Sequence, residues 1–63
     1  HDSEYTHGSI VWHKVSKMNG MVASILIRPT GLVIYEVIWS DMTEKYHYAM
    51  ELTSEDLSPM KAN

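Results

Sequence analysis

Apolar and polar side chains alternate along four segments of this chain, and turn residues separate the segments. Successive side chains of a β-strand point to opposite faces, so the alternation predicts strands over residues 9–15, 21–28, 32–40 and 46–52. Residues 32–40 carry the strongest pattern, because aliphatic, aromatic and β-branched residues fill most of the segment. They are predicted to form the central strand. Strands about ten residues apart, joined by short turns, indicate an antiparallel meander.

Turn residues mark where the predicted strands reverse direction. The Asn19-Gly20 pair predicts the tip of a hairpin between the first two strands, because both residue types accept a positive φ angle. A second tight turn is expected at residues 29–31, and residues 53–57 are typical of a capped helical turn near the C-terminus. The alternation also predicts the core, which we expect to contain Val11, Val22, Ile25, Val37 and Leu57.

A chain of 63 residues makes one small domain. A four-stranded sheet of this size must curl on itself or pair with another chain to cover both apolar faces. We therefore predict an all-β fold: a small SH3-like antiparallel barrel of four to five strands over residues 8–59, with a short helical turn near the C-terminus. Residues 1–7 are expected to be a flexible N-terminal tail and residues 60–63 a C-terminal tail.

Composition and charge limit the classes of protein to which this chain can belong. The chain has no cysteine, which excludes a disulfide framework and a thiolate zinc site. The longest apolar run is far shorter than the roughly 20 residues that cross a bilayer, so no membrane partner is expected. A cytoplasmic protein is expected, or a virion-associated one if a bacteriophage encodes it. The net charge of −3, with thinly spread cations, disfavours nucleic acid as a partner.

The order of features is similar to that of Tudor-type and other SH3-like barrels. The matching segments are residues 8–12, which open on Gly8, residues 20–25, which open on Gly20, the aromatic-x-Asp at residues 39–41, and residues 51–59 with their Leu-containing turn. In style the chain also resembles small barrel proteins of bacteriophages and mobile elements. The glycine that often follows the Asp in Tudor domains is replaced by Met42. The Ala-Leu-Tyr-Asp-Tyr motif of signalling SH3 domains is absent, so proline-rich peptides are not expected as ligands.

Aromatic residues are numerous, and none of them is Phe. Tyr and Trp favour half-buried positions and interfaces because they carry a polar group. Trp12, Trp39, Tyr46 and Tyr35 are therefore the candidates for an aromatic contact surface. The resemblance to Tudor-like barrels implies a cation–π cage for methylated cations, with Trp12, Trp39 and Tyr46 as the best matches by position. The alternative is that these rings only fill the core and its rim.

The sequence gives weaker support for a metal site or a catalytic site. His7, His13 and His47 could meet and hold zinc, but they lack ligand-type spacing, so solvated or hydrogen-bonded structural histidines are expected and no metal or cofactor is predicted. Glu36 and Glu51 could form a carboxylate pair on neighbouring strands, but glycosidase chemistry needs a cleft that a chain this small does not build alone. With no other nucleophile–base pair, no catalytic residue and no enzymatic activity are expected.

Two functional hypotheses remain. The first is a non-enzymatic protein–protein interaction or structural module that binds a protein partner or itself, for instance within a phage-like assembly. The alternative is a nucleic-acid-associated or methylated-peptide-binding Tudor-like barrel. In the nucleic-acid form, Trp12 or Trp39 would stack on bases, and three cations would contact phosphates: Lys14, Lys17 and Arg28.

Overall fold

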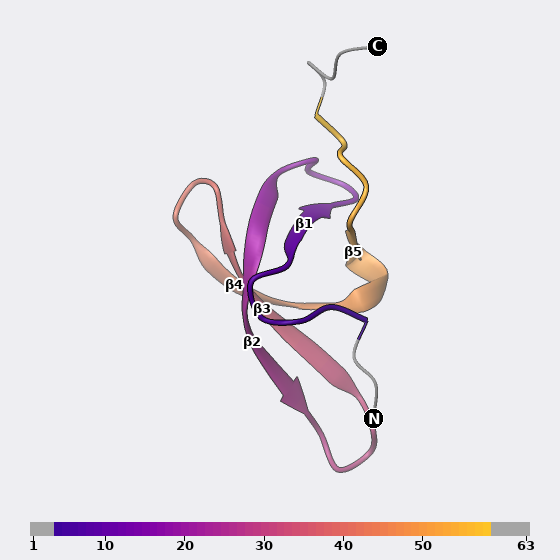
Figure 1. Ribbon diagram of the computed structural model, residues 1–63. Coiled ribbons are helices and arrows are strands. Elements are labelled where there is room, and N and C mark those ends of the chain that lie inside the picture. The colour runs from indigo at the N-terminus through magenta and orange to yellow at the C-terminus, as the bar shows by residue number, and fades with distance from the viewer. Residues whose placement is uncertain (1–3, 59–63) are drawn as a thin grey trace.

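Five antiparallel strands in one sheet make up this protein, whose computed structural model describes residues 4–58. The strands are β1 (Ile10–His13), β2 (Asn19–Ile27), β3 (Val33–Trp39), β4 (Glu44–Tyr48) and β5 (Leu52–Thr53). Their order across the sheet is β4-β3-β2-β1-β5, and a 3-10 turn, η1 (Ala49–Glu51), joins β4 to β5 (Figure 1). No helix of the described residues is long and apolar enough to cross a membrane.

The predicted all-β meander is confirmed, but the predicted barrel is not closed. β4 and β5 are the two edges of the sheet and do not pair with each other. β5 has only two residues, so it offers too short a ladder to close the sheet. The helical turn precedes β5, at residues 49–51, rather than following it at residues 53–57.

A β-bulge in β2 bends the sheet. Val22 lies opposite Val37, but the next pair joins Ser24 to Glu36, so Ala23 is an extra residue. The bulge reverses the alternation within β2. As a result, Val22 and Ile25 both contact the same core although they are three positions apart, a spacing that puts two side chains on opposite faces of a regular strand.

One face of the sheet, here called the inner face, carries the core. Its buried side chains are Val11, Val22, Tyr35, Val37, Trp39 and Leu52. The predicted core is confirmed for Val11, Val22 and Val37, which are at most 1% exposed, and Ile25 packs against them. It is wrong for Leu57, which is half-buried outside this cluster because the chain has left the sheet after Thr53.

The predicted hairpin tip at Asn19-Gly20 is wrong. Both residues belong to β2, where Gly20 lies opposite Val11, and the turn comes earlier, with Lys17 at a φ of 64°. Glycine is required at position 20 for a different reason. A Cβ there would lie 2.7 Å from the carbonyl oxygen of Ile38 and 2.8 Å from the Trp39 ring. The absent side chain lets β3 and the Trp39 ring pack closely against β2.

The N-terminal segment packs against the domain from Glu4 onward. The Gly8 amide donates to the Val22 carbonyl oxygen at 2.8 Å, and the Tyr5 ring contacts the core. Part of the segment predicted as a flexible tail is therefore held by the sheet. The predicted C-terminal tail, residues 60–63, lies outside the described residues.

Candidate functional site

The four candidate aromatic residues do not gather into one surface. Trp39 and Tyr35 are only 5% and 1% exposed, because both point to the inner face with Val37 between them. Placing Trp39 among side chains that escape the core was therefore wrong. Trp12 is half-buried on β1, and Tyr46 is 61% exposed on β4, which β2 and β3 separate from β1. Two of the four rings thus stay accessible, and they do not form a cage with the other two.

Tyr35 uses its hydroxyl to hold the N-terminal segment. Its oxygen accepts the Glu4 amide at 2.8 Å and the Tyr5 amide at 3.2 Å. The Tyr5 ring meets the Tyr35 ring edge-on at 5.4 Å, and its hydroxyl donates to the Leu52 carbonyl oxygen at 3.3 Å. Burial, the Glu4 charge and Tyr35 raise the pKa of Tyr5. The polar group of Tyr35 is thus occupied within the protein.

The three candidate phosphate contacts lie at two ends of the molecule. Lys14 and Lys17 belong to the turn before β2, whereas Arg28 follows β2 at its far end (Figure 1). β2 has nine residues, and a strand of that length spans about 30 Å. The three cations therefore do not form a continuous basic patch.

A hydrogen-bonded network joins β3, β4 and η1. The Trp39 indole Nε1 donates to Nε2 of His47 at 3.1 Å. The other ring nitrogen, Nδ1, lies 3.1 Å from Oε1 of Glu51, which also accepts the Tyr48 amide at 2.9 Å. The Tyr48 hydrogen bond, together with that of His47, holds the pKa of Glu51 below its usual value. His13 packs edge-on against His47, with ring centroids 5.2 Å apart.

His13, His47 and Glu51 are close enough to be tested as metal ligands, since one ligand atom from each lies within 4.8 Å of the others. The polarity of their hydrogen bonds opposes a metal. Nε2 of His47 accepts from Trp39, and an indole only donates, so the neutral ring carries its proton on Nδ1. Nδ1 of His13 likewise accepts the Val15 and Ser16 amides. A ligating histidine normally donates from its second nitrogen, so this cluster fits structural histidines.

The other pairings considered from sequence do not occur. His7 lies exposed in the turn before β1 and is not part of this cluster. Glu51 bonds to His47, whereas the Oε1 atom of Glu36 accepts the Ser24 hydroxyl at 2.9 Å on β2. The two carboxylates are therefore engaged at separate places.

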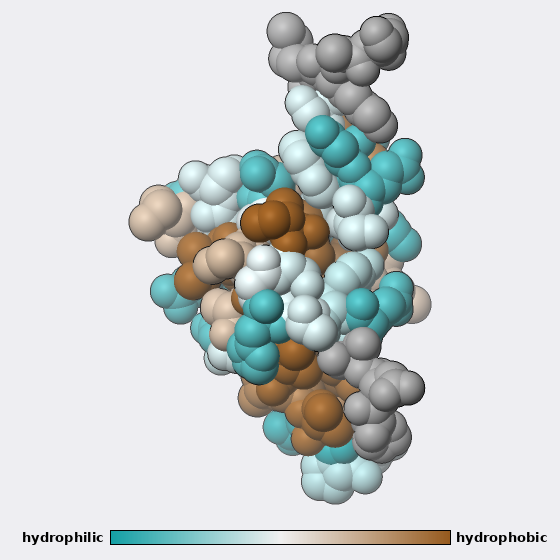
Figure 2. Space-filling view, in the orientation of Figure 1, coloured by the Kyte–Doolittle hydropathy of each residue, from teal (hydrophilic) through white to brown (hydrophobic). Residues whose placement is uncertain are grey.

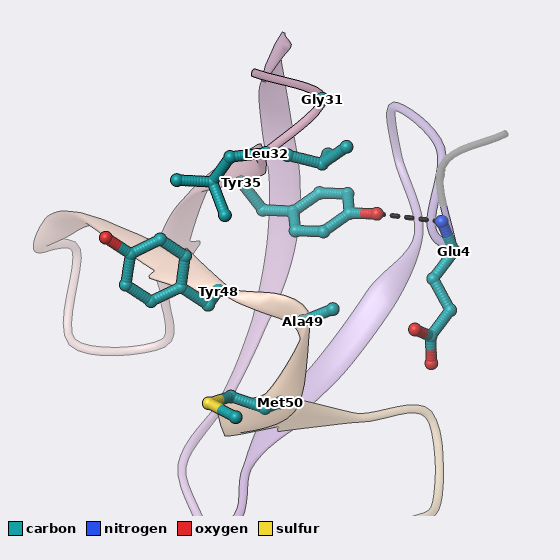
Figure 3. A pocket seen from close by; sticks show the side chains of 8 residues that line it. Glu4, Gly31, Leu32, Tyr35, Tyr48, Ala49 and Met50 are labelled. Carbon is teal, nitrogen blue, oxygen red and sulfur yellow. Dashed lines mark hydrogen bonds between the residues drawn. The ribbon is translucent and has the colours of Figure 1, made fainter. Parts of the chain in front are cut away.

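An apolar groove of about 700 Å³ lies between the start of β3 and η1. Leu32, Tyr48 and Met50 line it and are 45%, 46% and 76% exposed (Figure 3). Glu4, whose amide donates to the Tyr35 hydroxyl, supplies the only charged side chain of the lining among residues 4–58. Apolar surface also lies along the β2–β3 hairpin above its polar tip (Figure 2). Ile27, the last residue of β2, is 51% exposed.

A further apolar surface is the side of the sheet opposite the core, here called the outer face. Directly paired residues of antiparallel strands point to the same side, so the register defines this face. Its apolar residues are Ile10, Trp12, Met21, Leu26, Ile34, Ile38, Tyr46 and Tyr48, with Ser24 and Glu36 at the centre and Asn19 and Glu44 toward the edges. Tyr48 also lines the groove. Trp12 and Tyr46 of this face were predicted from the sequence as contact residues. The residues of β2 were not, because the bulge at Ala23 decides which of them reach this face. The lone Glu36 in an otherwise apolar strand was the available signal.

Comparisons of the chain with models of protein families, with curated proteins and with solved structures find no match.

Proposed function

We propose that this chain is a non-enzymatic protein-binding module that recognises a partner through its outer face. We further assign it to the SH3-like folds. The strand order β4-β3-β2-β1-β5, with a 3-10 turn between the last two strands of the chain, supports that assignment. The functional proposal rests on the surface rather than on the fold, because one fold serves many functions.

The main support for this proposal is that apolar side chains are exposed on the outer face across four adjacent strands. Ile10 is 57% exposed on β1, Met21 43% on β2 and Tyr46 61% on β4. Contiguous exposed apolar surface on a small protein marks an interaction site, because covering it releases about 25 cal/mol per Å². Tyr is also among the residues that contribute most to binding energy at interfaces.

Charge favours a protein over nucleic acid as the partner. The net charge is −3, and the outer face carries the carboxylate of Glu36 at its centre. Phosphate groups would be repelled by that charge, and the cations Lys17 and Arg28 lie at opposite ends of β2.

A peptide-display selection on the immobilised chain tests the proposal. We expect enriched peptides whose binding is lost in Met21→Ser and Tyr46→Ser, which remove apolar side chains from the outer face. Met42→Ser is the matched control, because Met42 is 82% exposed in the β3–β4 turn and is not one of the paired residues that define that face. Circular dichroism checks that each variant is folded.

The competing possibility is that peptides bind in the groove between β3 and η1. Leu32→Ser changes this groove, and Leu32 is not one of the paired residues that define the outer face. The proposal is wrong if no peptide is enriched, or if Leu32→Ser abolishes binding while Met21→Ser preserves it.

A further inference from the structure

Glu36 is a carboxylate at the centre of the mostly apolar outer face. A second carboxylate, that of Glu44, lies opposite Ile38 on the edge strand β4 and is exposed. On the outer face, Ser24 and Tyr46 lie directly opposite Glu36 on the neighbouring strands. Ile34 and Ile38 flank Glu36 along β3 and are themselves half-buried. The Ser24 hydroxyl donates to Oε1 at 2.9 Å, and a carboxylate has further capacity to accept hydrogen bonds.

This charge restricts what can cover the outer face. Burying a carboxylate without a cation or further hydrogen bonds is costly, so a purely apolar partner would lose much of what the surrounding side chains gain. A second copy of the chain packed symmetrically about this centre would bring two Glu36 carboxylates together. The occupant must therefore bring a positive charge to the centre of the face.

We propose, on the basis of the protein-binding function above, that the outer face binds a partner segment presenting one arginine between two apolar side chains. The guanidinium donates to the Glu36 carboxylate and lies against the Tyr46 ring, which is 61% exposed beside it. Arginine suits this place better than lysine, because its planar group can stack on an aromatic ring while it donates to a carboxylate.

The spacing on β3 sets the spacing of the partner. Ile34, Glu36 and Ile38 are each two residues apart on one strand, which corresponds to about 6.6–6.8 Å between neighbours. An extended segment has the same period, so the matching sequence is apolar-x-Arg-x-apolar. This chain itself lacks the pattern, because every Lys or Arg has a polar residue two positions later: Ser16, Asn19, Thr30, His47 and Asn63. The sequence thus disfavours a second copy as the occupant.

Titration with defined peptides, followed by amide chemical shifts of the ¹⁵N-labelled chain, tests the inference. The probe is acetyl-Leu-Ser-Arg-Ser-Leu-amide, and the matched peptide carries Gln in place of Arg. We expect the Arg peptide to bind about tenfold more tightly or better, as charge-assisted hydrogen bonds allow. The largest shifts should fall on Glu36, Ile38 and Tyr46.

Protein variants locate the charge that selects the peptide. Glu36→Gln keeps the shape of the side chain and should reduce the preference for Arg over Gln to about twofold or less. Glu55→Gln makes the same change of charge at an exposed position after β5 and should retain the preference. If Glu36→Gln does not fold, the two peptides compared on the unmodified chain still decide the question.

The outcomes separate this inference from the proposed function. Equal binding of both peptides on the outer face would overturn the arginine preference and leave protein binding by that face intact. Shifts confined to the groove around Leu32 and Met50 would overturn both. No shift with either peptide at millimolar concentration would overturn the arginine preference, and the display selection then decides the proposed function independently.

Discussion

Substituting Gly20 by alanine should destabilise this protein measurably. The new Cβ would lie 2.7 Å from the Ile38 carbonyl oxygen, 2.8 Å from the Trp39 ring and 2.8 Å from Cγ1 of Val37. One of these neighbours is backbone and the other two are packed core side chains, so the strands must separate locally. Inserting a methyl group into a packed core costs about 1–3 kcal/mol.

A smaller effect opposes this cost. Alanine reduces the conformational freedom of the unfolded chain and thereby stabilises by about 0.4–1 kcal/mol. The net loss is about 1–2 kcal/mol. A domain of this size loses about 4–8 °C of melting temperature per kcal/mol, so we expect Gly20→Ala to melt about 5–15 °C below the unmodified chain.

Thermal unfolding followed by circular dichroism measures this difference. Asn19→Ala is the matched control, because Asn19 is the exposed neighbour in the same strand, and its melting temperature should change little. A Gly20→Ala variant that melts at or above the unmodified temperature would refute the close packing of β2 against β3.

Three further changes test other parts of the structure. Met42 has a φ of 73°, so Met42→Gly should raise the unfolding free energy by about 0.5–1 kcal/mol, and an unchanged or lower urea midpoint would contradict this. Tyr35→Phe leaves the Glu4 and Tyr5 amides without their acceptor. It should cost about 1–3 kcal/mol and speed hydrogen exchange at both amides, whereas unchanged exchange would exclude the anchoring role. The lowered pKa of Glu51 means that its ionised form stabilises the fold above the usual pKa of 4.5 and that this contribution is lost as the pH falls below it. The difference in urea midpoint between the unmodified chain and Glu51→Gln should therefore be largest near neutral pH and shrink in acid, and a difference that grows in acid would reverse the assigned sign.

The strand pattern was predictable because it depends on local chemistry. The alternation over residues 32–40 identifies β3 and places Val37 in the core, and that part of the fold follows from burial on one face of a strand. The turns were harder to predict. Asn19-Gly20 has strong hairpin chemistry, yet Gly20 is needed for close packing across strands, and Lys17 takes the positive φ instead.

The candidate surfaces could not be derived from the sequence, because long-range pairing creates them. The bulge at Ala23 depends on how β2 pairs with β3, and it decides that Met21 and Leu26 share the outer face with Glu36. The groove combines Glu4 with residues near positions 32 and 50, which lie far apart in the chain. His13 and His47 were correctly considered as neighbours, but their hydrogen-bond polarity becomes apparent only in the structure.

Methionine oxidation tests whether the outer face is the binding surface, because three exposed methionines within residues 4–58 lie at three different surfaces. Met21 belongs to the outer face, Met42 to the β3–β4 turn and Met50 to the groove, with exposures of 43%, 82% and 76%. The chain is treated with hydrogen peroxide, alone and with a display-selected peptide bound, and oxidation of each residue is followed by mass spectrometry. If the outer face binds the peptide, the bound peptide slows oxidation of Met21 and leaves the oxidation rates of Met42 and Met50 unchanged. Protection of Met50 without protection of Met21 would contradict binding by the outer face.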